Sequence, residues 1–178
     1  EVCAHLKLTS LADYAIELEE DARKQGLSYL EFLFEILENF YQMQQEMRAK
    51  RWIKAAKFSR INTLDSFNFD KDLKLPETLI RQLATGEFIR EVKPIIFIGE
   101  SGTGKTHLDT AIGYGSAQKG FKVFFITVAD LANQLIEAKD AHTLSLAVKR
   151  FSGYDLLILD ELGFVPLSQV DAELIFQV

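Results

Sequence analysis

Apolar side chains in the first part of the chain recur at the spacing of an α-helix. The first set occupies positions i, i+3, i+4 and i+7 of one helical face: Leu11, Tyr14, Ala15 and Leu18. Gly26 breaks this pattern, and Ser28 with Glu31 forms the capping box of a second helix that continues toward Phe58. We therefore expect a small all-helical N-terminal domain over residues 1–62.

The last turns of this second helix are apolar on one side and basic on the other. The apolar stripe consists of Ala49, Trp52, Ile53 and Ala56. Four cations fall on the opposite side: Lys50, Arg51, Lys54 and Lys57. Such a row can neutralise the phosphates of a DNA duplex, but charge runs on helices are as often plain solvated faces, and the pattern favours neither. A membrane-surface helix is a weaker third interpretation, because the apolar stripe is modest.

The pattern changes in the second half of the chain. Polar residues and Pro76 predict a linker over residues 63–76. After it, short β-branched and aromatic runs predict strands at residues 95–98, 123–127 and 156–159. Helical stretches lie around them, at residues 78–89, 105–119, 129–139 and 143–152. This alternation is typical of an α/β domain with a parallel sheet flanked by helices.

Both ends of the chain suggest a fragment. It starts with Glu1, and it stops inside a segment, residues 168–178, whose capping residues and apolar spacing predict a helix. We therefore expect residues 77–178 to form an α/β core that is incomplete at its C-terminus.

Composition narrows the class of protein. With 48% hydrophobic residues in 178, the chain can fill a core, and its apolar runs are far shorter than the roughly 18 residues of a membrane span. One Cys fits a reducing cytoplasm. The net charge of −6 argues weakly against nucleic acid, but residues 48–62 hold six Lys and Arg and no acid. The chain average therefore hides a basic island.

The clearest chemical motif is a phosphate-binding loop. Residues 99–106 match G-x-x-x-x-G-K-[ST] at every fixed position, between a predicted strand and a predicted helix. Its glycines let backbone N–H groups point at phosphate oxygens, and the helix N-terminus adds partial positive charge. Lys105 would reach the β- and γ-phosphates, and the Thr106 hydroxyl would ligate Mg²⁺. The expected ATP-binding residues are Gly99, Glu100, Ser101, Gly102, Thr103, Gly104, Lys105, Thr106 and His107. Of these, His107 fits packing or capping better than catalysis.

A second motif supplies the acidic half of such a site. The apolar run 156–159 leads into Asp160 and Glu161. Asp160 would hold Mg²⁺ through water, and Glu161 would orient or deprotonate an attacking water. We therefore expect Lys105, Asp160 and Glu161 to be catalytic and Thr106 and Asp160 to hold the metal. The pair favours hydrolysis over transfer to a small molecule.

Taken together, these motifs resemble the IstB-type ATPases that assist insertion-sequence transposases, which are close relatives of DnaC-type helicase loaders. The resemblance covers nearly the whole chain, including residues 6–8, 48–58, 63–69, 83–89, 104–108 and 154–168. Its most specific part is the Gly-aromatic-x-Pro-Leu-Ser segment at residues 163–168.

The resemblance implies an AAA+ ATPase that binds ATP and Mg²⁺, oligomerises on double-stranded DNA and delivers a target site to an IstA-type transposase. It also implies DNA binding by the N-terminal helical region, which favours DNA contact at Lys50, Arg51, Lys54 and Lys57. The family's sensor Asn and arginine finger would follow Val178, so this chain is expected to hydrolyse ATP poorly, since an arginine finger contributes about 10³–10⁵ in rate. Two departures from the family pattern are Glu100-Ser101 in the loop and Asp109 after it.

Two other functions remain open from the sequence. One is a helicase loader that contacts single-stranded DNA, and the other is a nucleotide-binding regulatory module without a DNA role. An adjacent transposase gene would favour the transposition helper over the loader.

Overall fold

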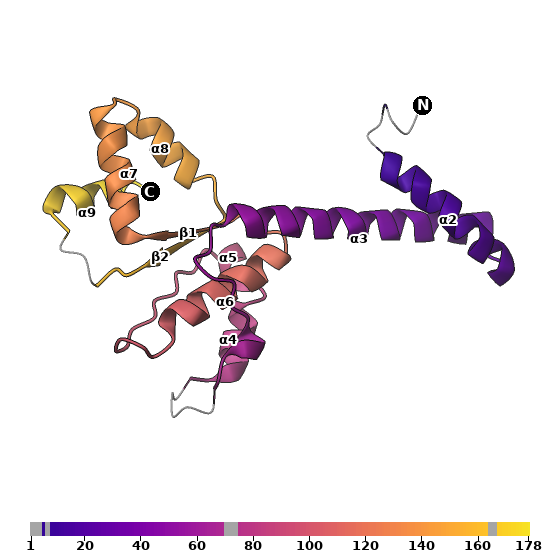
Figure 1. Ribbon diagram of the computed structural model, residues 1–178, viewed down its shortest axis with the longest axis horizontal. Coiled ribbons are helices and arrows are strands. Elements are labelled where there is room, and N and C mark those ends of the chain that lie inside the picture. Colours follow the sequence, from indigo (N-terminus) through magenta and orange to yellow (C-terminus); the bar gives the residue numbers. More distant parts are fainter. Residues whose placement is uncertain (1–4, 6–7, 70–74, 164–166) are drawn as a thin grey trace. The chain divides into compact units, whose positions relative to one another are not determined.

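The computed structural model describes residues 5, 8–69, 75–163 and 167–178 (Figure 1). The chain divides into two compact units, Glu1–Arg48 and Ala49–Val178. The sequence led us to expect this division at residue 62 instead. Residues 6–7 and 164–166, which form part of the family resemblance, lie outside the described residues.

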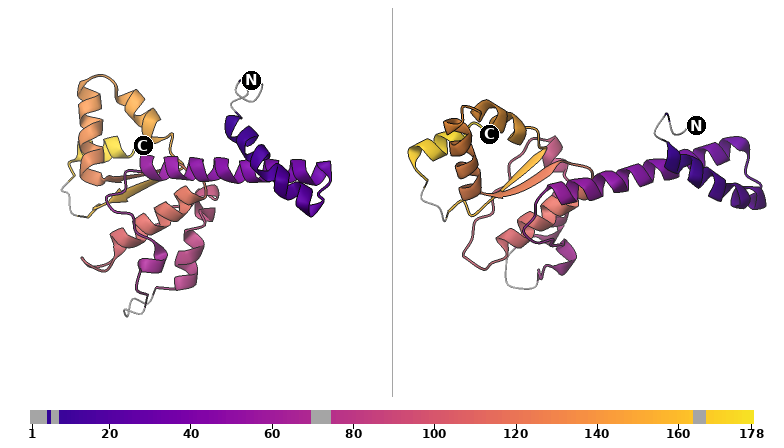
Figure 2. Two further views of the ribbon diagram at one scale, coloured as in Figure 1. Left: turned by 45° about the vertical axis from the view of Figure 1, so that its right-hand side comes forward. Right: turned by 45° about the horizontal axis from the view of Figure 1, so that its top comes forward.

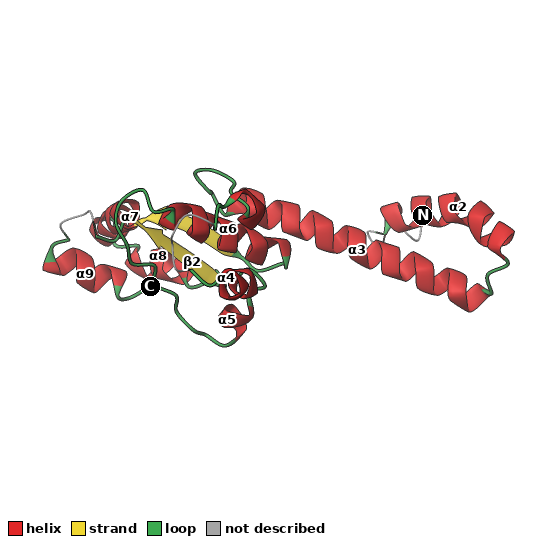
Figure 3. Cartoon of the chain, turned by 90° about the horizontal axis from the view of Figure 1, so that it is seen from below, coloured by secondary structure: helices red, strands yellow, loops and turns green. Residues whose placement is uncertain are grey.

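The first unit is a helical hairpin (Figure 3). Helix α2 covers Thr9–Gln25, and helix α3 covers Tyr29–Ala55, so that its last turns belong to the second unit. Gly26 ends α2 in the left-handed region, with φ of 69°, where glycine is unstrained. The predicted capping box is confirmed, because the Ser28 N–H donates to Glu31 Oε2 at 2.8 Å and the Glu31 N–H donates to Ser28 Oγ at 3.3 Å.

The end of α3 packs into the core of the second unit. Trp52, Ile53 and Ala56 contact a cluster that includes Val123 and Ile158. Just past the helix, the Phe125 N–H donates to the Ala56 carbonyl oxygen at 2.8 Å. The apolar stripe predicted on this helix therefore buries itself against the sheet, which is why the compact units divide before it.

A parallel pair of strands forms the centre of the second unit. Strands β1, Val123–Thr127, and β2, Leu156–Asp160, pair in register from Val123↔Leu156 to Thr127↔Asp160. The parallel pairing predicted from the sequence is confirmed. Helix α6 packs on one face of the pair, and three helices lie on the other (Figure 2). Their bounds are α6, Lys105–Gln118; α7, Val128–Asp140; α8, Leu144–Phe151; and α9, Gln169–Ile175.

Alternate side chains of β1 fill the two layers of this core. Phe124 and Ile126 pack among α7, α8 and α9, whereas Val123 and Phe125 pack toward α6 and the end of α3. This two-sided burial explains why the strand is apolar throughout rather than alternating.

The segment expected to be a linker packs onto the core. A 3₁₀ turn, η1, covers Leu64–Ser66, and Phe67, Phe69 and Leu75 contact a buried cluster that contains Leu108 of α6. The following region forms two short helices, α4, Glu77–Leu83, and α5, Glu87–Arg90, where the sequence predicted one. Gly86 separates them with φ of 79°, and a Cβ there would lie 2.4 Å from the Phe121 ring.

The prediction of a strand at residues 95–98 is wrong. Among the described residues, β1 and β2 pair only with each other, so this segment has no partner ladder. Ile95 and Phe97 pack against the cluster around Leu108, while Ile96 and Ile98 are 75% and 93% exposed. The alternation of buried and exposed side chains persists, but a strand also needs a neighbour's backbone groups. As for the helices in the described ranges, none is both long and apolar enough to cross a membrane.

Candidate nucleotide site and basic surface

The backbone of the phosphate loop is curled in front of a helix. Gly102 and Gly104 have φ of 79° and 91°, in the region that favours glycine. A Cβ on Gly104 would also lie 2.8 Å from the Phe67 ring. Thr103 Oγ1 donates to the Glu100 carbonyl oxygen at 2.9 Å and closes the loop. Helix α6 starts directly after Gly104, and the first N–H groups of a helix have no partner within it, which makes a helix start next to such a loop suited to phosphate binding.

Lys105 lies across this loop. Its Nζ donates to the carbonyl oxygens of Gly99 at 2.8 Å and Glu100 at 2.6 Å. Both acceptors are uncharged, so phosphate oxygens, which form stronger charge-assisted hydrogen bonds, can replace them.

Two of the expected metal ligands meet in space. Thr106 Oγ1 donates to Asp160 Oδ1 at 3.3 Å, although the two residues are 54 positions apart in the chain. Asp160 ends β2 and Thr106 lies in the first turn of α6, so the fold brings this strand end to this helix start. A hydroxyl beside a carboxylate is the type of oxygen pair that Mg²⁺ prefers, and these residues therefore fit the ion.

Glu161 follows Asp160 in a constrained conformation. Its φ is 64°, which is rare for a residue with a side chain, and its N–H donates to Asp160 Oδ1 at 2.9 Å. The Glu161 side chain is exposed. Backbone strain of this type collects at functional sites.

Asp109 adds a negative charge beside this group. It lies on α6 one turn after Lys105 and is partly buried. Burial and, to a lesser extent, the negative charge of Asp160 raise the pKa of the Asp109 carboxyl to about 6, against the opposing effect of the positive charge of Lys105. At neutral pH, Asp109 is still largely ionised, so it competes with phosphate for the favourable field of Lys105.

His107 connects the loop helix to η1. Its Nε2 lies 3.1 Å from the Thr63 carbonyl oxygen and 3.3 Å from Ser66 Oγ, and its ring meets the Phe67 ring edge-on at 5.2 Å. These contacts favour the packing role that the sequence suggested over a catalytic one.

A pocket of about 230 Å³ opens between the phosphate loop and residues 66–68, at the end of η1 and just after it. Its walls are formed by Ser66, Phe67 and Asn68 on one side and by Gly102, Thr103, Gly104 and His107 on the other. The sequence motif did not identify Ser66, Phe67 and Asn68 as site residues, because they precede the phosphate loop by more than 30 positions.

The basic residues lie at the end of α3 and just past it. Lys50, Arg51 and Lys54 are exposed on the helix. The expectation that Lys57 also lies on the helix is wrong, since α3 ends at Ala55 and Lys57 has a left-handed φ of 57°. The Ala56 carbonyl oxygen accepts from β1 at this point, and the Lys57 Nζ lies 5.8 Å from the centroid of the Phe124 ring.

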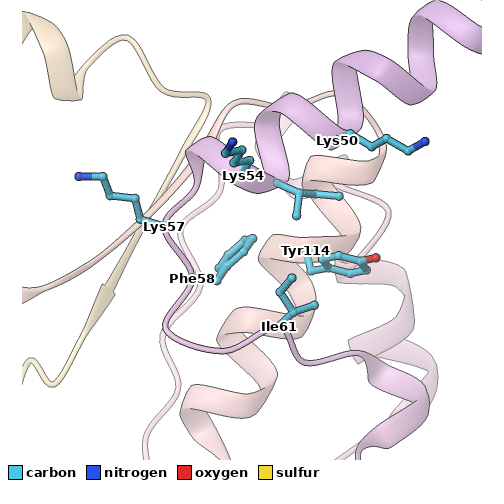
Figure 4. A pocket seen from close by; sticks show the side chains of 7 residues that line it. Lys50, Lys54, Lys57, Phe58, Ile61 and Tyr114 are labelled. Carbon is cyan, nitrogen blue, oxygen red and sulfur yellow. The ribbon is translucent and has the colours of Figure 1, made fainter.

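Beside these cations is a larger pocket, of about 510 Å³ (Figure 4). Lys50, Lys54 and Lys57 contribute its charges, and Ile53, Phe58, Ile61 and Tyr114 contribute its apolar walls. Tyr114 comes from α6, more than 50 positions after the others, which is why the sequence did not connect it with the basic helix.

Comparison with known proteins places the chain in a family. Residues 2–178 match the family model described as IstB-like ATP binding protein. Three similar relatives are each named as the putative ATP-binding protein of an insertion sequence. That of IS5376 from Geobacillus stearothermophilus is 36% identical over 178 residues, covering 100% of this chain and 71% of the relative. That of IS232 from Bacillus thuringiensis subsp. berliner is 30% identical, covering 97% and 69%. That of IS21 from Pseudomonas aeruginosa is 30% identical, covering 98% and 66%.

These matches include both the phosphate loop and the strand that ends in the acidic pair. They agree with the curled loop before α6 and with the contact between Thr106 and Asp160. The sequence matches over the whole length of the chain, and the geometry of the site agrees with ATP binding. This chain therefore belongs to the family of IstB-like ATP-binding proteins.

Proposed function

We propose that this protein binds ATP with Mg²⁺ and hydrolyses it, and that it uses this cycle to help a transposase capture double-stranded DNA. The observation that carries the nucleotide part is the Thr106–Asp160 hydrogen bond. It joins the phosphate loop to the acidic strand end, which are the two halves of a site for a metal-bound triphosphate.

Each residue then has a separate task. The N–H groups of residues 99–106 and the Lys105 ammonium hold the phosphates. Thr106 and Asp160 hold Mg²⁺, which when bound neutralises charge on the phosphates. Glu161 accepts a proton from, or orients, the attacking water, because it is exposed directly beside the metal ligand.

The DNA part rests on the basic surface and on the relatives. Residues 48–62 carry six cations and no acid, and Lys50, Arg51 and Lys54 are exposed. Relatives with 30–36% identity are named as putative ATP-binding proteins of insertion sequences, which supports a role beside a transposase. Delivery of target DNA and self-association on that DNA are part of the proposal.

Nucleotide binding is tested with a fluorescent ATP analogue. We expect Lys105→Ala to lose binding, because the neutral side chain leaves the phosphates without their main counter-charge. Lys119→Ala, at the other end of α6 and exposed, is the matched control and should bind like the parent protein. Equal affinity of the Lys105→Ala variant would contradict the assigned site.

Duplex binding is tested by charge reversal. We expect Lys50→Glu with Lys54→Glu to abolish binding to a duplex, and the affinity of the parent protein to fall steeply with salt. Reversal of the exposed Lys139 and Lys149 provides a control of equal charge. Binding that salt does not weaken would contradict a phosphate-binding role, and preference for single strands with capture of a replicative helicase would favour the loader.

A further inference from the structure

We propose that the pocket at the end of α3 takes an unpaired base of a DNA strand, while Lys50 and Lys54 at its rim contact the adjoining phosphates. This inference rests on the proposed DNA binding and names the part of the DNA that the basic surface takes. All the lining residues belong to the single compact unit Ala49–Val178.

The apolar walls of the pocket include two aromatic rings whose positions are fixed by neighbouring side chains. The Phe58 ring packs against the Phe125 ring with centroids 6.4 Å apart and belongs to the core cluster, yet it stays partly exposed in the pocket. Tyr114 is partly exposed on α6, and its hydroxyl accepts a hydrogen bond from Gln118 Nε2 at 3.3 Å. Figure 4 shows these two rings with Ile61 on one side of the pocket. A base that stacks on such a surface gains binding energy regardless of its identity.

The rim is positive without exception. Its three lysines are exposed, and no Asp or Glu is among the lining residues. Lys50 and Lys54 are one helical turn apart on α3, about 6 Å along the axis, so both can reach one strand. Lys57 points away from Phe58 and Tyr114 in Figure 4, and its Nζ lies 5.8 Å from the centroid of the Phe124 ring, so the phosphate contacts fall to Lys50 and Lys54.

The combination of lysines and aromatic rings favours some anionic ligands over others. An acidic peptide would satisfy the lysines but would leave the aromatic surfaces without a flat partner. A nucleotide satisfies both, and a volume of about 510 Å³ lies within the range of about 300–1,000 Å³ that is common for small-molecule pockets. The geometry therefore favours a base with its flanking phosphates.

A base inside an intact duplex cannot enter such a pocket. It must first leave the stack, which costs a few kcal/mol in paired DNA and least at a mismatch or in a single strand. The pocket therefore predicts that this protein binds a duplex with a local mismatch more tightly than the fully paired duplex.

The test is fluorescence anisotropy of the full chain with Mg-ATP and three labelled DNAs of equal length: a paired duplex, the same duplex with one central mismatch, and a single strand. We expect the mismatch to improve affinity by about fivefold or more, the lower limit for stacking one base. Tyr114→Leu should reduce this preference to less than twofold while it leaves affinity for the paired duplex unchanged. Tyr41→Leu, which replaces an exposed ring in the first unit, should keep the preference.

A second variant at an exposed position distinguishes loss of the pocket from misfolding of the Tyr114 variant. Ile61 is 59% exposed, so Ile61→Glu should fold normally, as circular dichroism would verify, and should repel a nucleotide from the pocket. Equal affinity of the parent protein for paired and mismatched duplexes, or a preference retained in both variants, would overturn the base pocket and leave duplex binding intact. Binding of polyglutamate but of none of the DNAs would overturn both the pocket and the proposed DNA function.

Discussion

Two carboxylates, those of Asp109 and Asp160, add negative charge to a site that is expected to bind an anionic phosphate. Burial, and after it repulsion from Asp160, raises the pKa of the Asp109 carboxyl, and the charge of Lys105 opposes this shift. Asp160 has an evident partner in Thr106, whereas Asp109 occupies the loop helix without a role in the proposed chemistry. We therefore expect Asp109 to weaken the protein in two measurable ways, in stability and in phosphate affinity.

The stability effect depends on pH. The pKa of Asp109 rises from 3.8 to about 6 on folding, so the folded state holds this proton more tightly than the unfolded state does. The loss of folding free energy caused by ionised Asp109 is absent below about pH 4, grows between pH 4 and 6, and is complete above pH 6. Asp109→Asn should therefore be more stable than the parent at pH 7, by about 1–2 kcal/mol after allowance for solvent screening, and equally stable near pH 4. Urea denaturation at several pH values measures this, and a gain that does not depend on pH would contradict it.

Glu161 gives a prediction about turnover. Replacing Glu161 with Gln removes the proton acceptor but keeps the shape of the side chain, so we expect ATP affinity within about twofold and a loss of roughly 10²–10⁴ in rate in the full-length protein. Glu137→Gln, on the exposed side of α7, is the control. Unchanged ATPase in the Glu161 variant, measured by phosphate release, would remove Glu161 from the mechanism.

At the scale of elements, tertiary contacts decide where two of the helices end. The sequence favours one helix over residues 78–89, yet the structure has two, because Gly86 takes φ of 79° and lets the Phe121 ring approach. Helix α3 likewise stops where a β1 N–H takes the Ala56 carbonyl oxygen. In both cases a tertiary contact outweighs a local helical preference.

Gly86→Ala should therefore destabilise the second unit by about 2–4 kcal/mol, from the positive φ together with the clash. Gly102→Ala is a matched control, since Gly102 has the same φ of 79° but open space around its Cβ position. It should cost only the backbone part, about 1 kcal/mol. Chemical denaturation of both variants separates the two contributions, and equal losses would show that the Phe121 ring moves aside at no cost.

At the scale of the whole molecule, the division of the chain is itself testable. Trp52, Ile53 and Phe58 pack in the core of the second unit, so a chain that starts at Ala49 should fold and bind ATP. A chain that starts at residue 63, after the boundary expected from the sequence, lacks these side chains and exposes the sheet face around Val123. We expect it to lose cooperative unfolding, as followed by circular dichroism. Equal melting of the two chains would favour the boundary at residue 62.

Much of this architecture followed from local patterns. Helical spacing located α2, α3, α6, α7 and α8 to within a few residues, because burial of one face repeats every 3.6 residues. The apolar runs gave β1 and β2, and their parallel pairing followed from the helices between them. The run at residues 95–98 looked the same but formed no strand, since pairing is a property of the neighbour as much as of the segment.

The sequence by itself determined the family, the phosphate loop and the acidic strand end, because each depends on residue types at short, fixed spacing. Tertiary structure alone decided what lies far apart in the chain but close in space. It joined Thr106 to Asp160, placed Phe67 against Gly104, and set Tyr114 beside the lysines of α3. The physical reason is that hydrogen bonds and packing act over a few ångströms of space, whereas a motif records only distance along the chain.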